Sequence, residues 1–322
     1  MPERLKARRR KSRDFQFSSS DESDGYRSDS SSSSTGFDIA RMHARKAEAV
    51  EIVPRGENVA DGESEIAYGK DGSLKYQKDF RGDGTREREI FYRIDRTKYK
   101  MNNFRNNGNL EDTTIYREGG TIDTSTNYRE NGSIEFETIY RENETISIIK
   151  EYTYNKTLDS ISFYRRDGVS IYKQEHYMED GKILDSISFY RRDGVSIYKQ
   201  EHYMEDGKTL DSVSFYRRDG VSIYKQEHYM EDGKTLDSVS FYMEHGSRKL
   251  QEHYRKDGKT VKYRNFYRDD GVTRDGSLAR REDYREDGTL ESKLSVREDG
   301  TLIYKRFPSE DNREVIQKRR RQ

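Results

Sequence analysis

The sequence contains no cysteine and no tryptophan among its 322 residues. The absence of cysteine excludes disulfide bonds, thiolate nucleophiles and thiolate metal ligands, and it agrees with a reducing compartment. Long hydrophobic runs are also missing, because no apolar segment approaches the roughly 20 residues that span a bilayer. The first fourteen residues are basic and no apolar stretch follows them. We therefore expect no signal peptide, no transmembrane segment and a cytoplasmic or nuclear location.

The chain also lacks an excess of charge of either sign. Lysine and arginine total 61 residues, and aspartate and glutamate also total 61. The whole chain therefore has no electrostatic bias toward nucleic acid, membranes or acidic substrates, and any bias must be local. Hydrophobic residues make up 30% and charged residues 38% of the sequence, which is lean for a globular core. The 25 tyrosines suit a half-exposed sheet, because their hydroxyl groups prefer to stay near water.

Both ends of the chain differ in composition from its middle. Residues 1–36 join a basic block to a serine-rich and acidic block, and we expect this arm to be disordered because it has too few apolar side chains to fold. Residues 37–59 are predicted to form a short helix and a linker, with Asp38 as N-cap and Pro54 as the stop of a helix over 38–53. Residues 313–322 form a basic tail.

Between these ends, residues 60–312 are repetitive. Turn dipeptides, most often Asp-Gly or Asn-Gly, recur every twelve residues from Asp71-Gly72 to Asp167-Gly168, and then mostly every thirteen. Such pairs are strong hairpin signals, since a type I′ turn needs positive φ at both central residues. The intervening segments, such as VSIYKQEHY and KTLDSVSFY, are rich in Tyr, Phe, Ile, Val, Thr and Ser, which favours strands over helices. The predicted fold is an all-β, tandem-repeat antiparallel meander of about twenty strands.

If every turn has two residues, the register of this meander can be read from the sequence. Phe163 would lie opposite Tyr172, and Asp159 opposite His176, with the same rows repeated along the sheet. Neither face would be uniformly apolar, so a single-layer twisted or coiled sheet is preferred to a sandwich. A three-residue loop would shift these pairs and break the Asp–His row, while the strands themselves would remain.

The stretch 160–237 is a near-perfect triplication, and a triplicated unit does not suit one unique active site. Like residues in its Asp and His rows would lie two strands apart, roughly 9.6 Å, which is too far to share one metal ion. Ser, His and Asp occur in every copy, yet no nucleophile elbow accompanies them. We therefore predict no enzymatic activity, no metal and no cofactor.

Alternate turns of a meander lie at opposite edges of its sheet, so one edge of the central copies would be basic and the other acidic. The acidic edge would carry Glu179, Asp180, Glu205, Asp206, Glu231 and Asp232. Such edges would suit edge-to-edge assembly or an acidic ligand on the basic edge. The alternative is that these are merely solvated turns. The candidate interaction surface comprises Arg165, Arg166, Arg191, Arg192, Arg217, Arg218, Tyr172, Tyr198 and Tyr224.

Two basic clusters and two serines mark the ends of the chain as further candidates. The clusters match nuclear-localisation, nucleic-acid or anionic-membrane patterns, and plain charged tails are the alternative. Ser18 and Ser19 each have an acidic residue three positions on, which is typical of acidophilic kinase sites. The clusters are Arg8, Arg9, Arg10 and Lys11 near the start, and Lys318, Arg319, Arg320 and Arg321 near the end.

The unit Tyr-x-x-Asp-Gly-x-Leu/Ile, as in YMEDGKTLDSVSFY and YREDGTLES, resembles short Tyr-Asp-Gly β-repeat families. These include phytoplasma-type repeat proteins of unknown function and MORN-like antitoxin repeats. The resemblance covers about residues 65–307 and departs from MORN repeats in period and in glycine spacing. It implies a scaffolding or binding role.

Together these patterns predict a non-catalytic repeat scaffold that presents an extended tyrosine-rich β surface to a protein partner or to further copies of itself. The alternative is a nuclear or nucleic-acid-associated factor, including one delivered into a host cell, that uses the basic terminal clusters.

Overall fold

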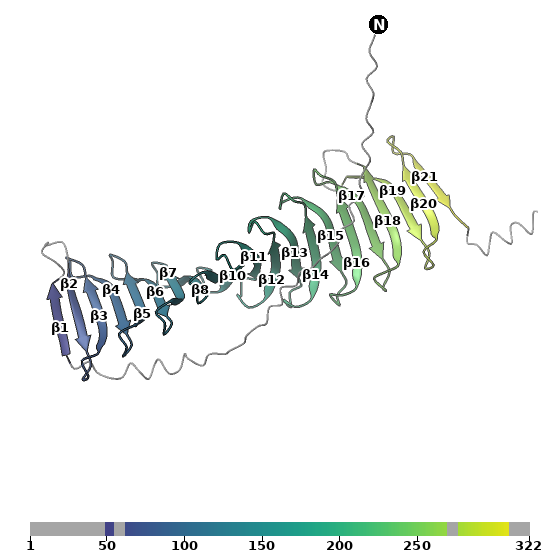
Figure 1. Cartoon of the computed structure of the whole chain (residues 1–322). Helices are drawn as coiled ribbons and strands as arrows, with labels where there is room; N and C mark the ends of the chain where they lie inside the picture. The colour runs from purple at the N-terminus through teal and green to yellow at the C-terminus, as the bar shows by residue number, and fades with distance from the viewer. Residues whose placement is uncertain (1–48, 55–61, 269–275, 309–322) are drawn as a thin grey trace, which may run out of the picture. The chain divides into compact units, whose positions relative to one another are not determined.

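The computed structural model describes residues 49–54, 62–268 and 276–308, which form 21 β-strands in one antiparallel sheet (Figure 1). Each strand pairs with the strands that precede and follow it in the sequence. The described residues contain no helix, and therefore none that could cross a bilayer. The predicted all-β meander is confirmed.

The strands have the following bounds: β1 Ala49–Pro54, β2 Glu63–Tyr68, β3 Leu74–Phe80, β4 Arg86–Tyr92, β5 Lys98–Phe104, β6 Leu110–Tyr116, β7 Ile122–Tyr128, β8 Ile134–Tyr140, β9 Ile146–Tyr152, β10 Leu158–Tyr164, β11 Ile171–Tyr177, β12 Leu184–Tyr190, β13 Ile197–Tyr203, β14 Leu210–Tyr216, β15 Ile223–Tyr229, β16 Leu236–Tyr242, β17 Arg248–Tyr254, β18 Val261–Arg268, β19 Ser277–Tyr284, β20 Leu290–Val296 and β21 Leu302–Arg306.

The helix predicted over residues 38–53 is wrong at its C-terminal end. Residues 49–53 belong to β1, which pairs with β2 from Ala49↔Tyr68 to Pro54↔Glu63. The run of β-branched residues before Pro54 favours a strand, and proline is tolerated at the outer edge of a sheet. The sheet therefore begins before residue 60. Residues 38–48, the arm 1–36 and the tail 313–322 lie outside the described residues.

The turns are not the predicted type I′ turns. In the turn after β10, the Gly168 N–H donates to the Arg165 carbonyl at 3.0 Å, and Gly168 has φ of +70°. Asp167 does not have positive φ. The chain thus makes a type I turn and then places glycine in the left-handed region. This combination is typical of the hairpin loops that are next most common after the two-residue type I′ and II′ loops.

The change of period from twelve to thirteen residues occurs in the loops, because the central strands keep seven residues. In a twelve-residue repeat the Arg81 N–H donates to the Thr85 carbonyl, four positions on. In a thirteen-residue repeat the Arg165 N–H donates to the Ser170 carbonyl, five positions on. The added residue follows the glycine, as Val169 does, and its side chain is 79% exposed.

The turn aspartates stabilise these loops through their carboxylates. Asp167 Oδ1 accepts hydrogen bonds from the Val169 and Ser170 N–H groups, each at 2.9 Å. Hydrogen bonding from the Ser170 side chain, together with these backbone donors, lowers the pKa of Asp167 to about 2. The Asp-Gly repeat therefore supplies both an anchor for the loop and a residue suited to positive φ.

A β-bulge accompanies every hairpin from β2–β3 to β19–β20. In the pair β10–β11, Phe163 lies opposite Lys173 and Tyr164 opposite Ile171, so Tyr172 is an extra residue. The register predicted from two-residue turns is therefore wrong. The longer loop shifts it by one residue, and the Asp–His row is lost, because His176 lies opposite Ser160 and Ser186.

The central repeats give the sheet two different faces. On one face, which we call the serine face, serines of the even-numbered strands alternate with Gln and His of the odd-numbered strands. On the other, the phenylalanine face, Phe, Ile or Val, and Leu alternate with Lys, Glu and Tyr. Neither face is uniformly apolar, as predicted, but the bulged register gathers the apolar side chains of the central strands mainly on the phenylalanine face.

Burial in this single layer comes from long side chains lying over small ones. Ser160 and Ser188 are 1% and 2% exposed, and Val213 on the opposite face is 3% exposed. The Tyr190 hydroxyl donates to Gln174 Oε1 at 2.7 Å on the serine face. Equivalent bonds join Tyr216 to Gln200 and Tyr242 to Gln226. The core is therefore thin, as the composition predicts.

Candidate interaction surface

The bulge at the start of β11 brings two side chains against the ring of Phe163. The ring centroid of Tyr172 lies 6.2 Å from that of Phe163, and Lys173 Nζ lies 5.0 Å from the same centroid. A bulge places two residues opposite one, which explains why both contact a single ring. Three such phenylalanine clusters follow one another: Phe163/Tyr172/Lys173, Phe189/Tyr198/Lys199 and Phe215/Tyr224/Lys225.

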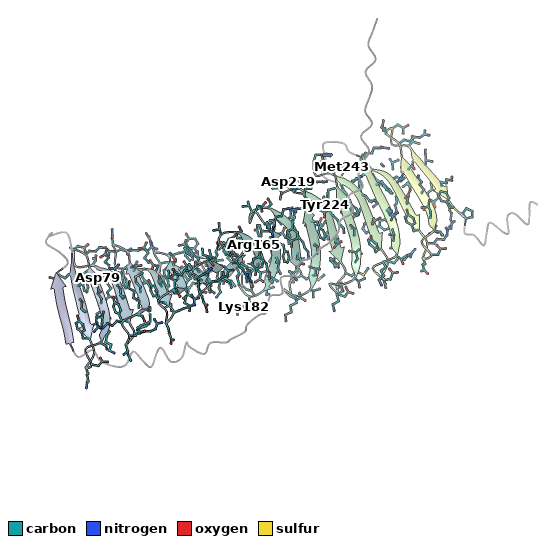
Figure 2. All side chains as sticks on the ribbon, in the orientation of Figure 1. Asp79, Arg165, Lys182, Asp219, Tyr224 and Met243 are labelled. Atoms are coloured by element: carbon teal, nitrogen blue, oxygen red, sulfur yellow. The ribbon has the colours of Figure 1, made fainter. Side chains whose placement is uncertain are left out.

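The structure brings the predicted tyrosines and arginines together beside the turns after β10, β12 and β14, which we call the arginine edge. The Arg165 guanidinium carbon lies 5.9 Å from the Tyr172 ring centroid, and that of Arg191 lies 6.0 Å from Tyr198. Tyr198 and Tyr224 are each 41% exposed. Figure 2 labels Arg165 and Tyr224 within this part of the sheet. The clusters repeat every second strand, roughly every 9.6 Å.

The two arginines of each such turn have different roles. The first is half-buried. Its Nη2 donates to the main-chain carbonyl of the tyrosine that ends the second strand after the turn, as from the turn after β10 to the end of β12. These bonds join Arg165 to Tyr190 at 3.2 Å, Arg191 to Tyr216 at 3.1 Å and Arg217 to Tyr242 at 2.8 Å. The second arginines are exposed: Arg166, Arg192 and Arg218. Three of the six predicted binding arginines therefore also fasten successive turns together.

The sequence analysis did not predict these hydrogen bonds from an arginine to the carbonyls of a neighbouring turn, although the twelve-residue repeats contain a pattern that indicates them. We call this set of bonds the arginine staple. An arginine directly follows the strand-ending aromatic residue at six consecutive turns: Arg81, Arg93, Arg105, Arg117, Arg129 and Arg141. Arg93 donates to the carbonyls of Lys98 at 2.6 Å, Tyr116 at 2.5 Å and Arg117 at 3.0 Å. Residues that recur at fixed positions regardless of strand sequence indicate a backbone role.

Beside the clusters, a polar chain runs along β11, β13 and β15 on the phenylalanine face. Lys173 Nζ lies 2.7 Å from Glu175 Oε1, and the Tyr177 hydroxyl donates to Glu175 Oε2 at 2.8 Å. Burial and this hydrogen bond raise the pKa of Tyr177 to about 12, and Tyr229 and Tyr254 also reach about 12 for the same reasons. These groups satisfy one another and belong to the framework of the sheet.

These Tyr–Glu hydrogen bonds predict that some tyrosines of the folded protein lose their proton at a higher pH than free tyrosine does. In the folded protein, part of the tyrosinate absorbance near 295 nm should appear only near pH 12, whereas in urea all of it should appear near pH 10. Because the folded pKa lies above the unfolded one, the stabilisation is complete below pH 10 and is lost between pH 10 and 12. The triple variant E175Q/E201Q/E227Q should shift the late phase to lower pH. A titration with one phase near pH 10 in both states would contradict these contacts.

The described residues hold no cluster of three His, Cys, Asp or Glu residues that could bind a metal ion. A shallow, open depression of 410 Å³ lies between two turns of the same edge and is lined by Val221, Ser222, Ile223, Tyr242, Glu244, His245 and Gly246. The His245 ring nitrogen Nε2 lies 2.7 Å from Ser247 Oγ within its own turn. We assign no chemistry to this depression.

The terminal candidates cannot be placed in this geometry. The basic clusters Arg8–Lys11 and Lys318–Arg321, and the predicted phosphorylation sites Ser18 and Ser19, lie outside the described residues.

No protein-family model and no curated protein matches this sequence. Solved structures similar in part include a TarM G117R mutant of S. aureus, at 10% identity and a TM-score of 0.25 over 38% of this chain. Others are a GtfA/B complex, at 13% and 0.20 over 37%, and a TcdB2-TccC3-Cdc42 complex, at 12% and 0.20 over 80%. The matches span 23%, 22% and 17% of those chains. Likenesses this weak carry no argument about function.

Proposed function

We propose that this chain is a non-catalytic repeat scaffold that presents a tyrosine-rich β surface to a protein partner. The observation that carries the proposal is the recurrence of one cluster in one geometry. The Phe–Tyr centroid distances are 6.2, 6.3 and 6.3 Å in the three phenylalanine clusters. Tyrosine and arginine are enriched where proteins bind one another, and evenly spaced copies suit a partner that engages several at once.

The arrangement of the polar groups supports a non-catalytic role. The Lys–Glu–Tyr chains are hydrogen-bonded internally, and the central histidines lie opposite serines of the neighbouring strands. Each of these groups recurs from copy to copy in the same setting, so no copy is set apart as a reaction centre. A repeated surface of this kind favours binding over turnover.

Selection of binding peptides from a random library, with the full-length chain as the target, tests the proposal. Selected peptides should bind the wild type and should lose affinity stepwise in Y172A, Y172A/Y198A and Y172A/Y198A/Y224A. Each step should weaken binding roughly 5- to 30-fold, as expected for an interface tyrosine that contributes about 1–2 kcal/mol. Far-UV circular dichroism checks that each variant remains folded.

A matched control removes the equivalent bulge residues near the opposite edge. Asp159, Asp185 and Asp211 are exposed bulge residues on alternate strands, just as the three tyrosines are bulge residues on the strands between them. The variant D159A/D185A/D211A should bind the selected peptides as the wild type does. If the triple tyrosine variant also binds them unchanged, this surface is not the binding site.

A further inference from the structure

The two long edges of the central repeats carry exposed charges of opposite sign. On the arginine edge, the second arginine of each turn is exposed: Arg166, Arg192 and Arg218. The turns after β11, β13 and β15 form the other edge, which we call the glutamate edge, and expose Glu179, Glu205 and Glu231. Figure 2 labels Asp219 along one edge and Lys182 along the other.

These six charges are available for binding, because other residues fasten the turns. The first arginines donate to main-chain carbonyls, and the turn aspartates accept main-chain N–H groups. None of the six exposed side chains makes a salt bridge within the described residues. They therefore form two ladders of charge whose members make no ion pair within the described sheet.

The two ladders have the same spacing. Members of each ladder are 26 positions apart in the sequence and lie on every second turn, so both repeat at about twice the strand spacing, roughly 9.6 Å. Three arginines of one edge could therefore meet three glutamates of the other together. Single exposed ion pairs contribute little, about 0.2–1 kcal/mol, but a matched row binds as a unit.

Further features of the two edges complement each other. Val169, Val195 and Val221 are each 79% exposed beside the arginines and offer apolar contact area. The glutamate edge also exposes Lys182, Lys208 and Lys234, which can face the turn aspartates of the arginine edge. Each edge thus carries a major charge and a minor charge of the opposite sign, arranged in the same repeat.

We propose that the arginine edge of one chain docks against the glutamate edge of a second copy of the same chain. Such a contact joins two different surfaces, so it leaves one free edge of each kind and permits further copies to add side by side. This self-association uses the edges of the sheet and leaves the phenylalanine clusters on its face for a partner. The two proposals are tested by different variants, because self-association depends on the second arginine of each turn and the partner surface on the three bulge tyrosines.

Charge reversal on each edge gives a decisive test by sedimentation velocity. The wild type should associate with increasing concentration at low salt, and salt should weaken this association. The variants R166E/R192E/R218E and E179R/E205R/E231R should each be monomeric, because both edges then carry the same sign. An equimolar mixture of the two variants should associate again, since each supplies the edge that the other has lost.

Three outcomes would overturn the proposal: a wild type that stays monomeric at low salt, variants that self-associate as the wild type does, or a mixture that remains monomeric. The control K249E/K256E/K262E reverses three exposed lysines outside the two ladders and should associate like the wild type. A parallel titration with a polyglutamate peptide tests whether the arginine ladder binds an acidic peptide instead of a second copy of the chain. Peptide binding by a wild type that does not self-associate would assign that edge to an acidic ligand.

Discussion

Replacing Gly181 with alanine is expected to destabilise the sheet by about 2–5 kcal/mol, whereas the same change at Gly84 should cost only about 1–2 kcal/mol. The two glycines have similar φ, +68° and +78°, so the cost of the left-handed conformation is common to both. At Gly181 an added Cβ would lie 2.5 Å from the Leu158 backbone nitrogen. At Gly84 it would meet nothing within 4 Å. The difference therefore measures the packing of one turn against the next along the same edge.

The natural sequence already contains the relevant comparison. Three turns of the twelve-residue type hold a non-glycine residue at this position, with φ of 69°, 60° and 68°: Arg96, Glu144 and Lys156. Described turns of the thirteen-residue type hold glycine, and an added Cβ there would come within 3 Å of a neighbouring turn. Urea unfolding followed by circular dichroism gives both free energies. Equal losses for G181A and G84A would show that the turns do not pack closely.

Replacing Arg93 with lysine should destabilise the protein by about 2–3 kcal/mol, although the charge is unchanged. The guanidinium of Arg93 reaches three backbone carbonyls in two successive turns, and a single ammonium group cannot reproduce that fork. Hydrogen bonds from a charged donor contribute roughly 1.5–3 kcal/mol, and the carbonyls would lose their donor.

Arg96 provides a control within the same turn. Its side chain is exposed, so R96K should change the free energy of unfolding by less than about 0.5 kcal/mol. Because each repeat contacts mainly its neighbours, hydrogen exchange should accelerate first in the turns after β4 and β6. Similar losses in the free energy of unfolding for R93K and R96K would contradict a stabilising role for the Arg93–carbonyl hydrogen bonds.

The alternating architecture of this sheet is predictable from sequence because it rests on local chemistry. Asp-Gly pairs such as Asp167-Gly168 mark the turns, and β-branched and aromatic residues mark the strands between them. The register is not predictable in this way, because the type I turn with its bulge and the type I′ turn use the same dipeptide. One residue of difference moves His176 from Asp159 to Ser160, and no propensity distinguishes the two pairings.

The candidate surface was partly predictable for the same reason. Because successive strands of a meander run in opposite directions, Arg165 in the turn after β10 and Tyr172 at the start of β11 lie near the same edge in any register. The structure places their side chains in contact. The contact of Tyr172 and Lys173 with one phenylalanine depends on the bulge, so it could not be foreseen. The carbonyl contacts of Arg165 depend on a turn two strands on, which only the three-dimensional stacking supplies.

The register that assembles the phenylalanine clusters is tested most directly by paired cysteines, which are clean probes because the chain has none of its own. Ser162 and Gln174 lie opposite each other, at a separation that suits a disulfide, while Ile161 and Gln174 lie on opposite faces. The variant S162C/Q174C should therefore form an intramolecular disulfide readily under mild oxidation, and I161C/Q174C should not. The reverse result would contradict the bulged register and would separate Tyr172 and Lys173 from their shared contact with Phe163.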